Sequence, residues 1–265
     1  MLGIWMDLYF LSSNLELKMN IWHISDTHTF HRLLEPPHLV DVVIHSGDAS
    51  NSRDSIQSNK ELLDFFDWFK NLPIKHKIFV AGNHDVAIER FRYWSKDIEE
   101  MGITYLENSS TIINGIKIWG SPYTPTYGTD WSFQMNRNKI SRVWDTIPYD
   151  ADIVVTHGPP KGILDTTLNR KNELESVGDN SLAKRIEDVM PFAHLFGHVH
   201  NTKWIRNSGK FLSDIQYSNG SVVEDGKFGK LISNGNVLQI TFCNLLNQYL
   251  MRGSDVSNYK SGDVL

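Results

Sequence analysis

Five short segments of this 265-residue chain each combine acidic, amide or imidazole side chains. Imidazole and carboxylate groups together suit Mn, Fe, Zn and related divalent ions, and a carboxamide oxygen can complete such a ligand set. Chemistry at a metal centre is therefore the first hypothesis that these residues raise. The segments are Asp26-Thr27-His28, Gly47-Asp48, Gly82-Asn83-His84-Asp85, Thr156-His157-Gly158 and Gly197-His198-Val199-His200.

The spacing inside these segments suits a shared site. Alternate residues of a strand face the same side, so the two ends of an Asp-x-His or a His-x-His triplet can present two ligands together. The chain has one such triplet of each kind, at residues 26–28 and 198–200. Glycines at positions 47, 82 and 197 would let the backbone turn sharply and approach the ions.

Each segment alone has an ordinary explanation. A single Asp at a strand end, such as Asp48, is more often a turn former or a helix cap than a ligand. A single buried His is more often a hydrogen-bonded core residue, and a His-x-His pair can arise by chance as readily as by chelation. The order of all five segments, and their common place after predicted strands, make coincidence the weaker explanation.

The elements that must position these segments follow from hydrophobic patterning. Short runs rich in β-branched residues predict buried strands that end where the polar segments begin. Because the early pattern alternates strands and helices, it predicts an α/β protein with parallel pairing, in which ligands bind beyond the carboxyl ends of the strands. The predicted strands cover residues 20–24, 41–45, 76–81, 116–119, 152–156, 194–196 and 237–242.

Helices are predicted between several of these strands. Apolar residues recur at i, i+3, i+4 and i+7 from Leu62 to Phe69, which predicts an amphipathic helix over residues 59–70. Ser58 or Asn59 is its expected N-cap. Further helices are expected at residues 86–100, 139–145 and 182–189. Pro, Gly and aromatic residues without a period predict a loop over residues 121–133, and a long loop beside a site usually carries function.

Length, composition and charge favour one folded domain without a nucleic-acid footprint. The chain is 40% hydrophobic and 22% charged, which is ordinary for a protein with a substantial core. A net charge of −5 and the absence of a Lys/Arg block disfavour binding to duplex nucleic acid, so small or single-stranded substrates fit better. The single cysteine, Cys243, excludes an internal disulfide, and the cytoplasm is the expected compartment.

The domain is expected over residues 19–252, between an N-terminal extension (1–18) and a flexible tail (253–265). The extension lacks a basic n-region and a small-residue cleavage site, so a signal peptide is not expected. No run of about 18 apolar residues could span a bilayer, so no membrane association is expected either.

The order of the five segments resembles the calcineurin-like metallophosphoesterase superfamily, whose pattern is D-x-H, G-D, G-N-H-[DE], H-G and G-H-x-H. This sequence reads DTH, GD, GNHD, THGPP and GHVH, and the resemblance covers residues 20–245 with no motif missing. The flanking segments HSGD, NLPIKHKIFVAGNHD, GSPYTP and VTHGPP are similar to those of the metallophosphoesterase-domain-containing (class III cyclic nucleotide phosphodiesterase-like) proteins. Those proteins act on cyclic nucleotides and aryl phosphodiesters.

The resemblance implies a four-layer α/β sandwich of two mixed sheets flanked by helices, and a centre of two divalent ions. Mn is the expected laboratory ion, with Fe, Zn, Co or Ni as alternatives. The residues implied for the first ion are Asp26, His28, Asp48 and His200. Those implied for the second ion are Asp48, Asn83, His157 and His198. Asp48 would bridge, and two ions about 4 Å apart need such a shared anionic ligand to offset their repulsion.

Two further residues are implied for catalysis. His84 resembles the non-ligating histidine of the family, which would stabilise the transition state and protonate the departing oxygen. Its alternative is a structural histidine hydrogen-bonded in a turn. Asp85 would orient His84, or equally would cap a helix N-terminus.

The implied reaction is hydrolysis of a small phosphodiester or nucleotide, such as a cyclic nucleotide, by a metal-bridging hydroxide. A nuclease or a phosphomonoesterase could use the same site, because fold does not decide the substrate. A scaffold protein that has lost turnover predicts a degraded ligand set, and here the set is intact. The sequence determines neither the oligomeric state nor the substrate-binding residues.

Residues outside the motifs have weaker assignments. Three polar residues could contact a phosphate or a base, although a solvated loop is the better interpretation of each. They are His31, Asn51 and Arg53. Three aromatic residues could stack a nucleobase or simply pack in the core. They are Tyr123, Tyr127 and Trp131. Histidines without a motif are expected in the core or on the surface. They are His23, His31, His38, His45, His76 and His194.

Overall fold

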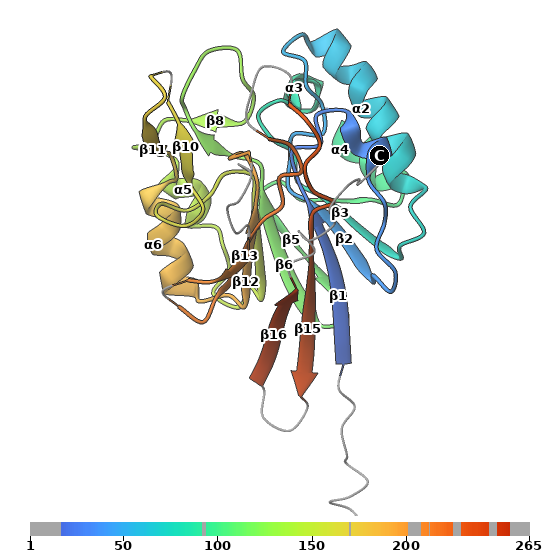
Figure 1. The fold of residues 1–265 in the computed structure, drawn as a ribbon, viewed down its shortest axis with the longest axis vertical. Coiled ribbons are helices and arrows are strands. Elements are labelled where there is room, and N and C mark those ends of the chain that lie inside the picture. Colours follow the sequence, from blue (N-terminus) through green and yellow to red (C-terminus); the bar gives the residue numbers. More distant parts are fainter. Residues whose placement is uncertain are drawn as a thin grey trace, which may run out of the picture.

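Two six-stranded β-sheets lie at the centre of the molecule (Figure 1). The computed structural model describes residues 17–91, 94–169, 171–200, 208–211, 213–224, 229–243 and 248–254. Within these residues the first strand begins at Leu17 and the last ends at Ser254. The predicted N-terminal extension and C-terminal tail therefore lie almost entirely outside the described residues.

The first sheet has the strand order β16-β15-β1-β2-β3-β4. Strands β1 to β4 pair in parallel, with Ile21 opposite Val42 and Val42 opposite His76. Strand β15 pairs antiparallel with β1, and β16 pairs antiparallel with β15. The strands are β1 Leu17–Ile24, β2 Val42–His45, β3 His76–Phe79, β4 Thr104–Tyr105, β15 Asn236–Cys243 and β16 Gln248–Ser254.

The second sheet has the order β13-β14-β12-β9-β6-β5. Its four inner strands are parallel, and the edge strands β5 and β13 run antiparallel to their neighbours. The strands are β5 Ser109–Ile113, β6 Ile116–Ser121, β9 Ile153–Thr156, β12 Ala193–Phe196, β13 Ser208–Lys210 and β14 Gln216–Asn219. Both sheets are thus mixed, with a parallel centre.

The two sheets pack face to face through a shared apolar layer. Side chains alternate across a strand, so each inner strand contributes every second residue to this layer. Full burial of one such aliphatic side chain stabilises the fold by about 1.5–3 kcal/mol. The first sheet contributes Met19, Ile21, Val42, Ile44, Ile78, Leu238 and Ile240. The second contributes Ile113, Ile116, Ile118, Ile153, Val155, Ala193 and Leu195.

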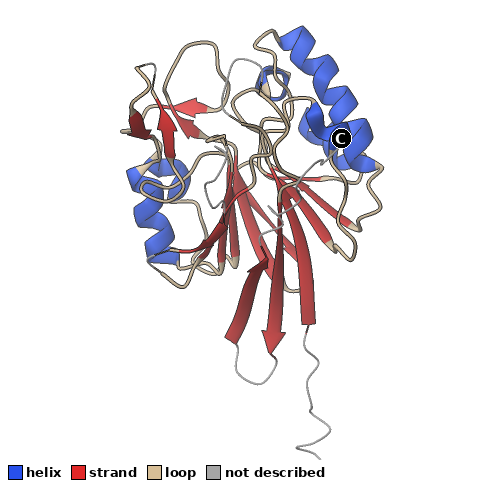
Figure 2. Cartoon of the chain, in the orientation of Figure 1, coloured by secondary structure: helices blue, strands red, loops and turns tan. Residues whose placement is uncertain are grey.

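Helices cover the two outer faces, as Figure 2 shows, and complete four layers. Helices α2 (Ser55–Lys70), α3 (Val86–Arg90) and α4 (Trp94–Glu100) lie against the first sheet. Helices α5 (Ser141–Trp144) and α6 (Asn180–Val189) lie against the second. The predicted α/β four-layer sandwich is confirmed.

Helix α2 illustrates how the pattern sets the packing and where it misplaces an end. The predicted apolar stripe from Leu62 to Phe69 is buried against the first sheet. The N-cap, however, is Asp54 rather than Ser58 or Asn59, because its carboxylate accepts hydrogen bonds from the amides of the first helical turn. The prediction was wrong by one turn, since several Ser, Asn and Asp residues precede the apolar stripe and each could cap it.

All seven predicted strands are present, while three connecting regions differ in detail. The single helix predicted over residues 86–100 is two helices, α3 and α4. The loop predicted over residues 121–133 contains β7 (Thr124–Pro125), which pairs with β8 (Gln134–Met135). Strands β10 (Thr166–Leu168) and β11 (Leu174–Ser176) form an additional hairpin, and a short 3-10 helix, η1, covers Phe30–Leu33.

Among the described helices, none is both long and apolar enough to cross a bilayer.

Candidate metal centre

The five polar segments meet at one edge of the molecule, where the parallel strands of both sheets end. Strands β1, β2 and β3 lead into Asp26, Asp48 and Asn83, and strands β9 and β12 lead into His157 and His198. Parallel neighbours have their carboxyl ends at the same sheet edge, so this convergence follows from the strand directions. The His198 amide donates to both Asp26 carboxylate oxygens, at 2.9 and 3.1 Å, and thereby joins the two sheets.

The backbone leaves the strands in a conformation that most residues avoid. Asp26, His28, Asp48 and His198 have φ angles of 51°, 39°, 59° and 67°. Non-glycine residues with positive φ are uncommon, and such strain collects at functional sites where the surroundings enforce it. The side chains at 26 and 28 therefore converge because of left-handed turns. Strand alternation was the predicted reason why Asp26 and His28, and likewise His198 and His200, would present ligands together, and this reason was wrong.

Two glycines are required by the close approach of these segments. Gly47 has a φ of 110°, and a Cβ there would lie 2.8 Å from the Ala81 carbonyl oxygen and would overlap the His157 ring. A Cβ on Gly197 would overlap Ser25 Oγ and the Asp26 carboxylate. The missing side chains at these glycines make room for the candidate ligand residues themselves, while the predicted approach of the backbone to ions stays a prediction.

Among the described residues, the candidate ligand atoms form three overlapping groups, each with its atoms within 4.8 Å of one another. The first group is Asp26, His28 and His200; the second is His28, Asp48 and His84; the third is Asp48, His157 and His198. Asn83 joins the third group, because its Oδ1 lies 2.9 Å from His157 Nε2. The structure thus brings together all seven residues of the ligand set implied by the resemblance, and separates His198 from His200 by group.

The Asp48 carboxylate occupies the centre of the site. Its Oδ1 accepts a 2.7 Å hydrogen bond from the His84 amide, which fixes the carboxylate plane. Its Oδ2 lies 3.3 Å from His157 Nε2 and 3.9 Å from His28 Nε2. Although burial would raise the pKa of Asp48, the neighbouring histidines hold this pKa well below its usual range. Asp48 is therefore an anion that faces both sides of the site.

Backbone carbonyl groups set the tautomers of two candidate ligands. His28 Nδ1 lies 3.2 Å from the Ser50 carbonyl oxygen, and His157 Nδ1 lies 2.9 Å from that of Ser46. A carbonyl only accepts, so Nδ1–H is the donor in both rings and the neutral ring carries its lone pair on Nε2. Such second contacts are what orient metal-bound histidines in general.

The atoms that these two Nε2 nitrogens face decide whether the site fits a cation. His157 Nε2 faces Asn83 Oδ1 and Asp48 Oδ2, while His28 Nε2 lies 3.1 Å from His200 Nε2. Lone pairs directed at one another repel unless a proton or a metal ion lies between them. The donor set of imidazole, carboxylate and amide oxygen suits divalent transition metals, so the residues fit such ions.

The charge states of the site follow from burial and from its two carboxylates. Burial lowers the pKa of His28 to about 4 and that of His198 to about 3. Burial would also lower the pKa of His157, but the adjacent Asp48 carboxylate outweighs it and raises the value to about 9. Against burial, the hydrogen bond from His200 holds the pKa of Asp26 below its usual range. Without a cation, His157 takes up the proton that balances Asp48.

His84 lies at the solvent side of this centre and is partly exposed. Its Nδ1 donates to the Asn51 carbonyl oxygen at 2.8 Å, which leaves Nε2 free to face the site. Its ring lies 4.6 Å from the His28 ring and 4.2 Å from the Trp131 ring, centroid to centroid. Distance alone also admits His84 as a ligand beside His28 and Asp48. Its partial exposure and its place outside the buried ligands suit a group that meets the substrate.

Asp85 differs from both of its predicted roles. Its carboxylate accepts hydrogen bonds from the amides of Asp48, Ser50 and Gly82, at 2.8–2.9 Å, and from Ser50 Oγ. It makes no capping bond to α3, and the group that holds the His84 ring is the Asn51 carbonyl. Burial first, and then Asp48, raise the pKa of Asp85 to about 7. Asp85 therefore fastens the turn at 82–85 to the loop that carries Asp48, because a buried carboxylate collects the donors of both.

His45 supports the site in a way that its motif-free sequence position did not indicate. Its Nδ1 accepts a 3.2 Å hydrogen bond from the Gly47 amide, so the ring is protonated on Nε2, which lies 3.1 Å from Thr27 Oγ1. Burial lowers the pKa of His45 to about 3 and keeps it neutral. One ring thus ties the turn before Asp48 to the residue between Asp26 and His28.

His23 and His194 are both buried, in β1 and in β12. His23 lies between Ser218 Oγ, at 2.8 Å, and Ser46 Oγ, at 3.0 Å. His194 Nε2 lies 2.9 Å from Thr156 Oγ1, whose own proton goes to the Gly158 carbonyl. The expectation of core positions holds for these two histidines, for His45 and for His31, while His38 is exposed and His76 is half-buried.

An aromatic wall borders the site. We use this name for Tyr127 and Trp131 of the loop between β7 and β8, together with Arg53. The Tyr127 ring lies 5.2 Å from the His198 ring and 6.3 Å from the Trp131 ring. The Arg53 guanidinium carbon lies 3.9 Å above the Trp131 ring. Tyr123 instead packs in the core against Phe133.

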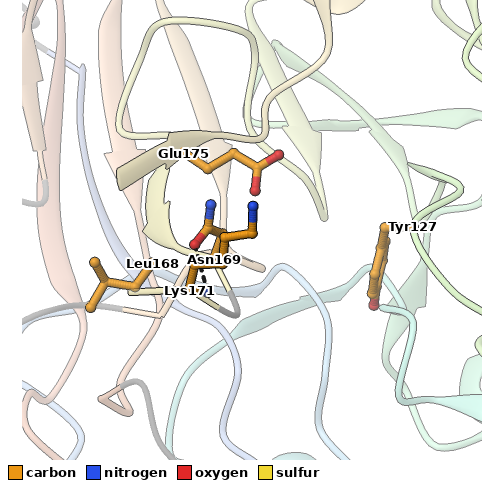
Figure 3. A pocket seen from close by; sticks show the side chains of 5 residues that line it. All are labelled: Tyr127, Leu168, Asn169, Lys171 and Glu175. Carbon is orange, nitrogen blue, oxygen red and sulfur yellow. Dashed lines mark hydrogen bonds between the residues drawn. The ribbon is translucent and has the colours of Figure 1, made fainter. Parts of the chain in front are cut away.

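Tyr127 also lines an open cavity of about 560 Å³ (Figure 3). The remaining lining residues come from the β10–β11 hairpin, and they are Leu168, Asn169, Lys171 and Glu175. In the close view Tyr127 stands opposite the hairpin residues across this space. Tyr127 therefore contacts a candidate ligand, His198, and also lines the cavity.

Three comparisons with known proteins bear on this centre. Residues 19–202 match the profile of the calcineurin-like phosphoesterase family. A UPF0046 protein of Caenorhabditis elegans is 30% identical over 218 residues, which cover 76% of this chain and 71% of that protein. The human metallophosphoesterase domain-containing protein 1 is 30% identical over 224 residues, and the match covers 75% of this chain but only 64% of the human protein.

Among solved structures, the phosphopantetheinyl hydrolase of Mycobacterium tuberculosis has the same fold, with a TM-score of 0.54 and 16% sequence identity. That match covers 77% of this chain and 89% of the hydrolase. The chain belongs to the calcineurin-like phosphoesterase family, a class of phosphoester hydrolases that use divalent metal ions. The seven candidate ligands fit this class by residue type and by geometry.

Proposed function

We propose that the chain hydrolyses phosphodiesters, with cyclic nucleotides as the substrate class, at a centre that holds two divalent ions. The observation that carries this proposal is the position of Asp48, whose carboxylate belongs to two of the three groups of candidate ligand atoms. A carboxylate shared in this way can offset the mutual repulsion of two nearby cations. Mn is our proposal for the ion that supports activity in the laboratory.

The residues that would hold the ions form two sets around Asp48. Asp26, His28 and His200 would complete one set, and Asn83, His157 and His198 the other. When bound, two such ions supply an activated water molecule and neutralise charge on the phosphoryl oxygens. The chain itself supplies imidazole rings fixed at Nδ1 and carboxylates that are anionic at neutral pH, and His157 would release its Nε2 proton when a cation binds.

His84 is our candidate for the leaving-group side of the reaction. Hydrolysis forms a new P–O bond from water, breaks the ester P–O bond, and leaves an alcohol oxygen that needs a proton. With Nδ1–H held by Asn51, the imidazolium form of His84 can donate Nε2–H to that oxygen. The exposed flank of His84 carries Trp131 and Tyr127, whose planar faces suit an aryl group or a base.

The test is hydrolysis by metal-stripped protein, with and without added Mn. The substrates are bis(p-nitrophenyl) phosphate, p-nitrophenyl phosphate, and 2′,3′- and 3′,5′-cyclic nucleotides. Metal-dependent cleavage that favours the diesters over the monoester supports the proposal. Preference for p-nitrophenyl phosphate would replace it with a phosphomonoesterase, and inactivity on all four with metals bound would reject phosphodiester hydrolysis. Asp150→Ala is the control variant. It removes an exposed surface carboxylate and should keep the wild-type activity.

A further inference from the structure

Arg53 lies at the outer end of a row of rings that begins at the metal centre. The His28 and His84 centroids are 4.6 Å apart, those of His84 and Trp131 are 4.2 Å apart, and Arg53 Cζ lies 3.9 Å from the Trp131 centroid. Exposure rises along this row, from the buried His28 through the partly buried His84 and Trp131 to the exposed Arg53. The guanidinium is therefore placed beyond His84, on the side away from the buried ligands.

The guanidinium of Arg53 has its hydrogen-bonding edges available. A cation stacked on an aromatic face uses its π surface, and its five N–H groups remain in the plane and point outward. Across the described part of the chain, no carboxylate comes within ion-pair distance of Arg53. Its stacking partner orders the side chain while leaving the donors for another group.

The acidic side chains next to Arg53 accept hydrogen bonds from backbone amides. Asp54 caps helix α2 through the amides of Ile56 and Gln57. Glu61 accepts from the amides of Asn51 and Ser52, at 2.7 and 3.0 Å. The carboxylates that could neutralise the arginine instead hold its loop in place. A fixed, unpaired arginine at the rim of a site is suited to bind an anion from outside the chain.

We propose that Arg53 selects substrates whose leaving alcohol carries an anionic group, such as a phosphate or a carboxylate. This inference rests on the proposed phosphodiester hydrolysis and on His84 at the leaving-group side. The phosphoryl group that reacts belongs at Asp48 and His28, whereas Arg53 lies one ring beyond His84 and meets the departing substituent. Guanidinium binds carboxylate and phosphate oxygens with two parallel N–H donors, so the contact discriminates by charge and by shape.

The test uses a matched pair of diesters, the methyl 4-carboxyphenyl and the methyl 4-carbamoylphenyl phosphates. They share the methyl group and differ in the charge of the phenol that leaves. With wild-type protein and Mn, kcat/KM is expected to be about 10- to 100-fold higher for the carboxylate diester, the range of a hydrogen bond to a charged group. Arg53→Gln should remove this preference. Arg53→Lys should keep only part of it, because an ammonium has the positive charge but lacks the planar fork of donors.

Lys60→Gln is the matched control, because it removes one positive charge from the exposed face of the same helix that follows Arg53. It should leave the preference at its wild-type value. Trp131→Leu should reduce the preference by releasing the guanidinium, whereas Trp131→Phe should retain most of it. Equal losses of Arg53→Gln activity on both diesters would overturn the proposal and show that Arg53 contacts the phosphoryl group instead.

Binding separates this inference from the proposed hydrolysis. The methyl 4-carboxybenzyl and 4-carbamoylbenzyl phosphonates lack the scissile oxygen, so calorimetry measures their affinity without turnover. Tighter binding of the carboxylate form by the wild type, lost in Arg53→Gln, supports the Arg53 contact even when no diester is hydrolysed. Hydrolysis of both diesters at equal efficiency, with equal phosphonate affinities, rejects the role of Arg53 and leaves the proposed function intact.

Discussion

Two groups of histidines in this molecule, which we call layers, have different roles. The rim histidines, His28, His157, His198 and His200, lie beyond the strands, in the site. The framework histidines are His23, His45 and His194, and they lie within strands β1, β2 and β12. Burial lowers the pKa of each framework histidine to about 3. A lowered pKa does not by itself distinguish the framework histidines, because burial also lowers the pKa of His28 and His198, whereas Asp48 raises that of His157.

The partners of the ring nitrogens separate them. Every framework ring has a Ser or Thr hydroxyl at one or both of its nitrogens, and a hydroxyl can donate to or accept from a neutral imidazole. The rim rings His28 and His157 are held at Nδ1 by carbonyls and present Nε2 to carboxylate oxygen, amide oxygen or another ring nitrogen. His157 Nε2 faces two oxygen acceptors, so a proton or a metal ion must lie between them, and this difference marks the site.

The largest expected effect follows from removing the carboxylate on which the rim depends. Asp48→Ala should release at least one metal ion per chain and lower kcat on bis(p-nitrophenyl) phosphate by about 10³-fold or more, as expected for loss of a shared ligand. Elemental analysis of the purified variant beside wild type makes the measurement. Two ions per chain in Asp48→Ala would contradict the bridging position. Circular dichroism provides the control for folding.

His84→Ala tests a histidine that belongs to neither layer. It should keep the wild-type metal content and lose turnover by about 10²- to 10⁴-fold, the range for a positioned general acid. The loss should shrink for a diester with a better leaving group, which needs less protonation. Loss of metal in His84→Ala would instead assign His84 to the rim, as its distance to His28 and Asp48 also permits.

His45 variants test whether the framework layer positions the rim. His45→Leu should weaken metal affinity by about 10- to 100-fold, as second contacts to metal ligands do, because the turns at Gly47 and Thr27 lose their shared tie. His45→Asn offers an oxygen near Nδ1 and His45→Gln a donor near Nε2, so each should restore part of the affinity. Competition with a chelator measures it. A purely structural role would change the unfolding free energy and leave metal affinity at the wild-type value.

The smallest effect is expected at an exposed histidine outside both layers. His38→Gln should change the free energy of unfolding by less than about 0.5 kcal/mol, since a surface substitution away from caps and contacts rarely costs more. Urea denaturation followed by fluorescence gives this value, and metal content and turnover should equal those of wild type. A change in metal content or in turnover would show that the number of histidines, rather than their position, governs the centre.

Much of the fold could be predicted from the sequence because buried parallel strands carry a strong local signal. β-branched runs located all seven predicted strands, and the stripe from Leu62 to Phe69 located the buried face of α2. The cap of α2 could not be chosen locally, since several residues before the stripe can accept amide hydrogen bonds. The division of residues 86–100 into two helices was also beyond the pattern.

The candidate site shows the same limit at the level of single residues. Its five segments were visible because imidazole, carboxylate and glycine recur at strand ends. The contact between Ser50 and His28 was not visible, because it is made by the backbone carbonyl of Ser50, a group that every residue type has. His45 lacked a motif, since Thr27 becomes its partner only after two strands pair. Asp85 took an unexpected role because the donors that reach it come from two separate loops.

The sequence by itself determined which chemical groups are present and that they follow strands, because side-chain type and short-range hydrophobic period are properties of neighbouring residues. Only the tertiary structure decided which nitrogen of His28 and of His157 faces the site, which candidate ligand atoms surround Asp48, and how Trp131 and Arg53 border His84. These features depend on contacts between segments far apart in the chain. The packing of two sheets creates those contacts, and no local pattern encodes them.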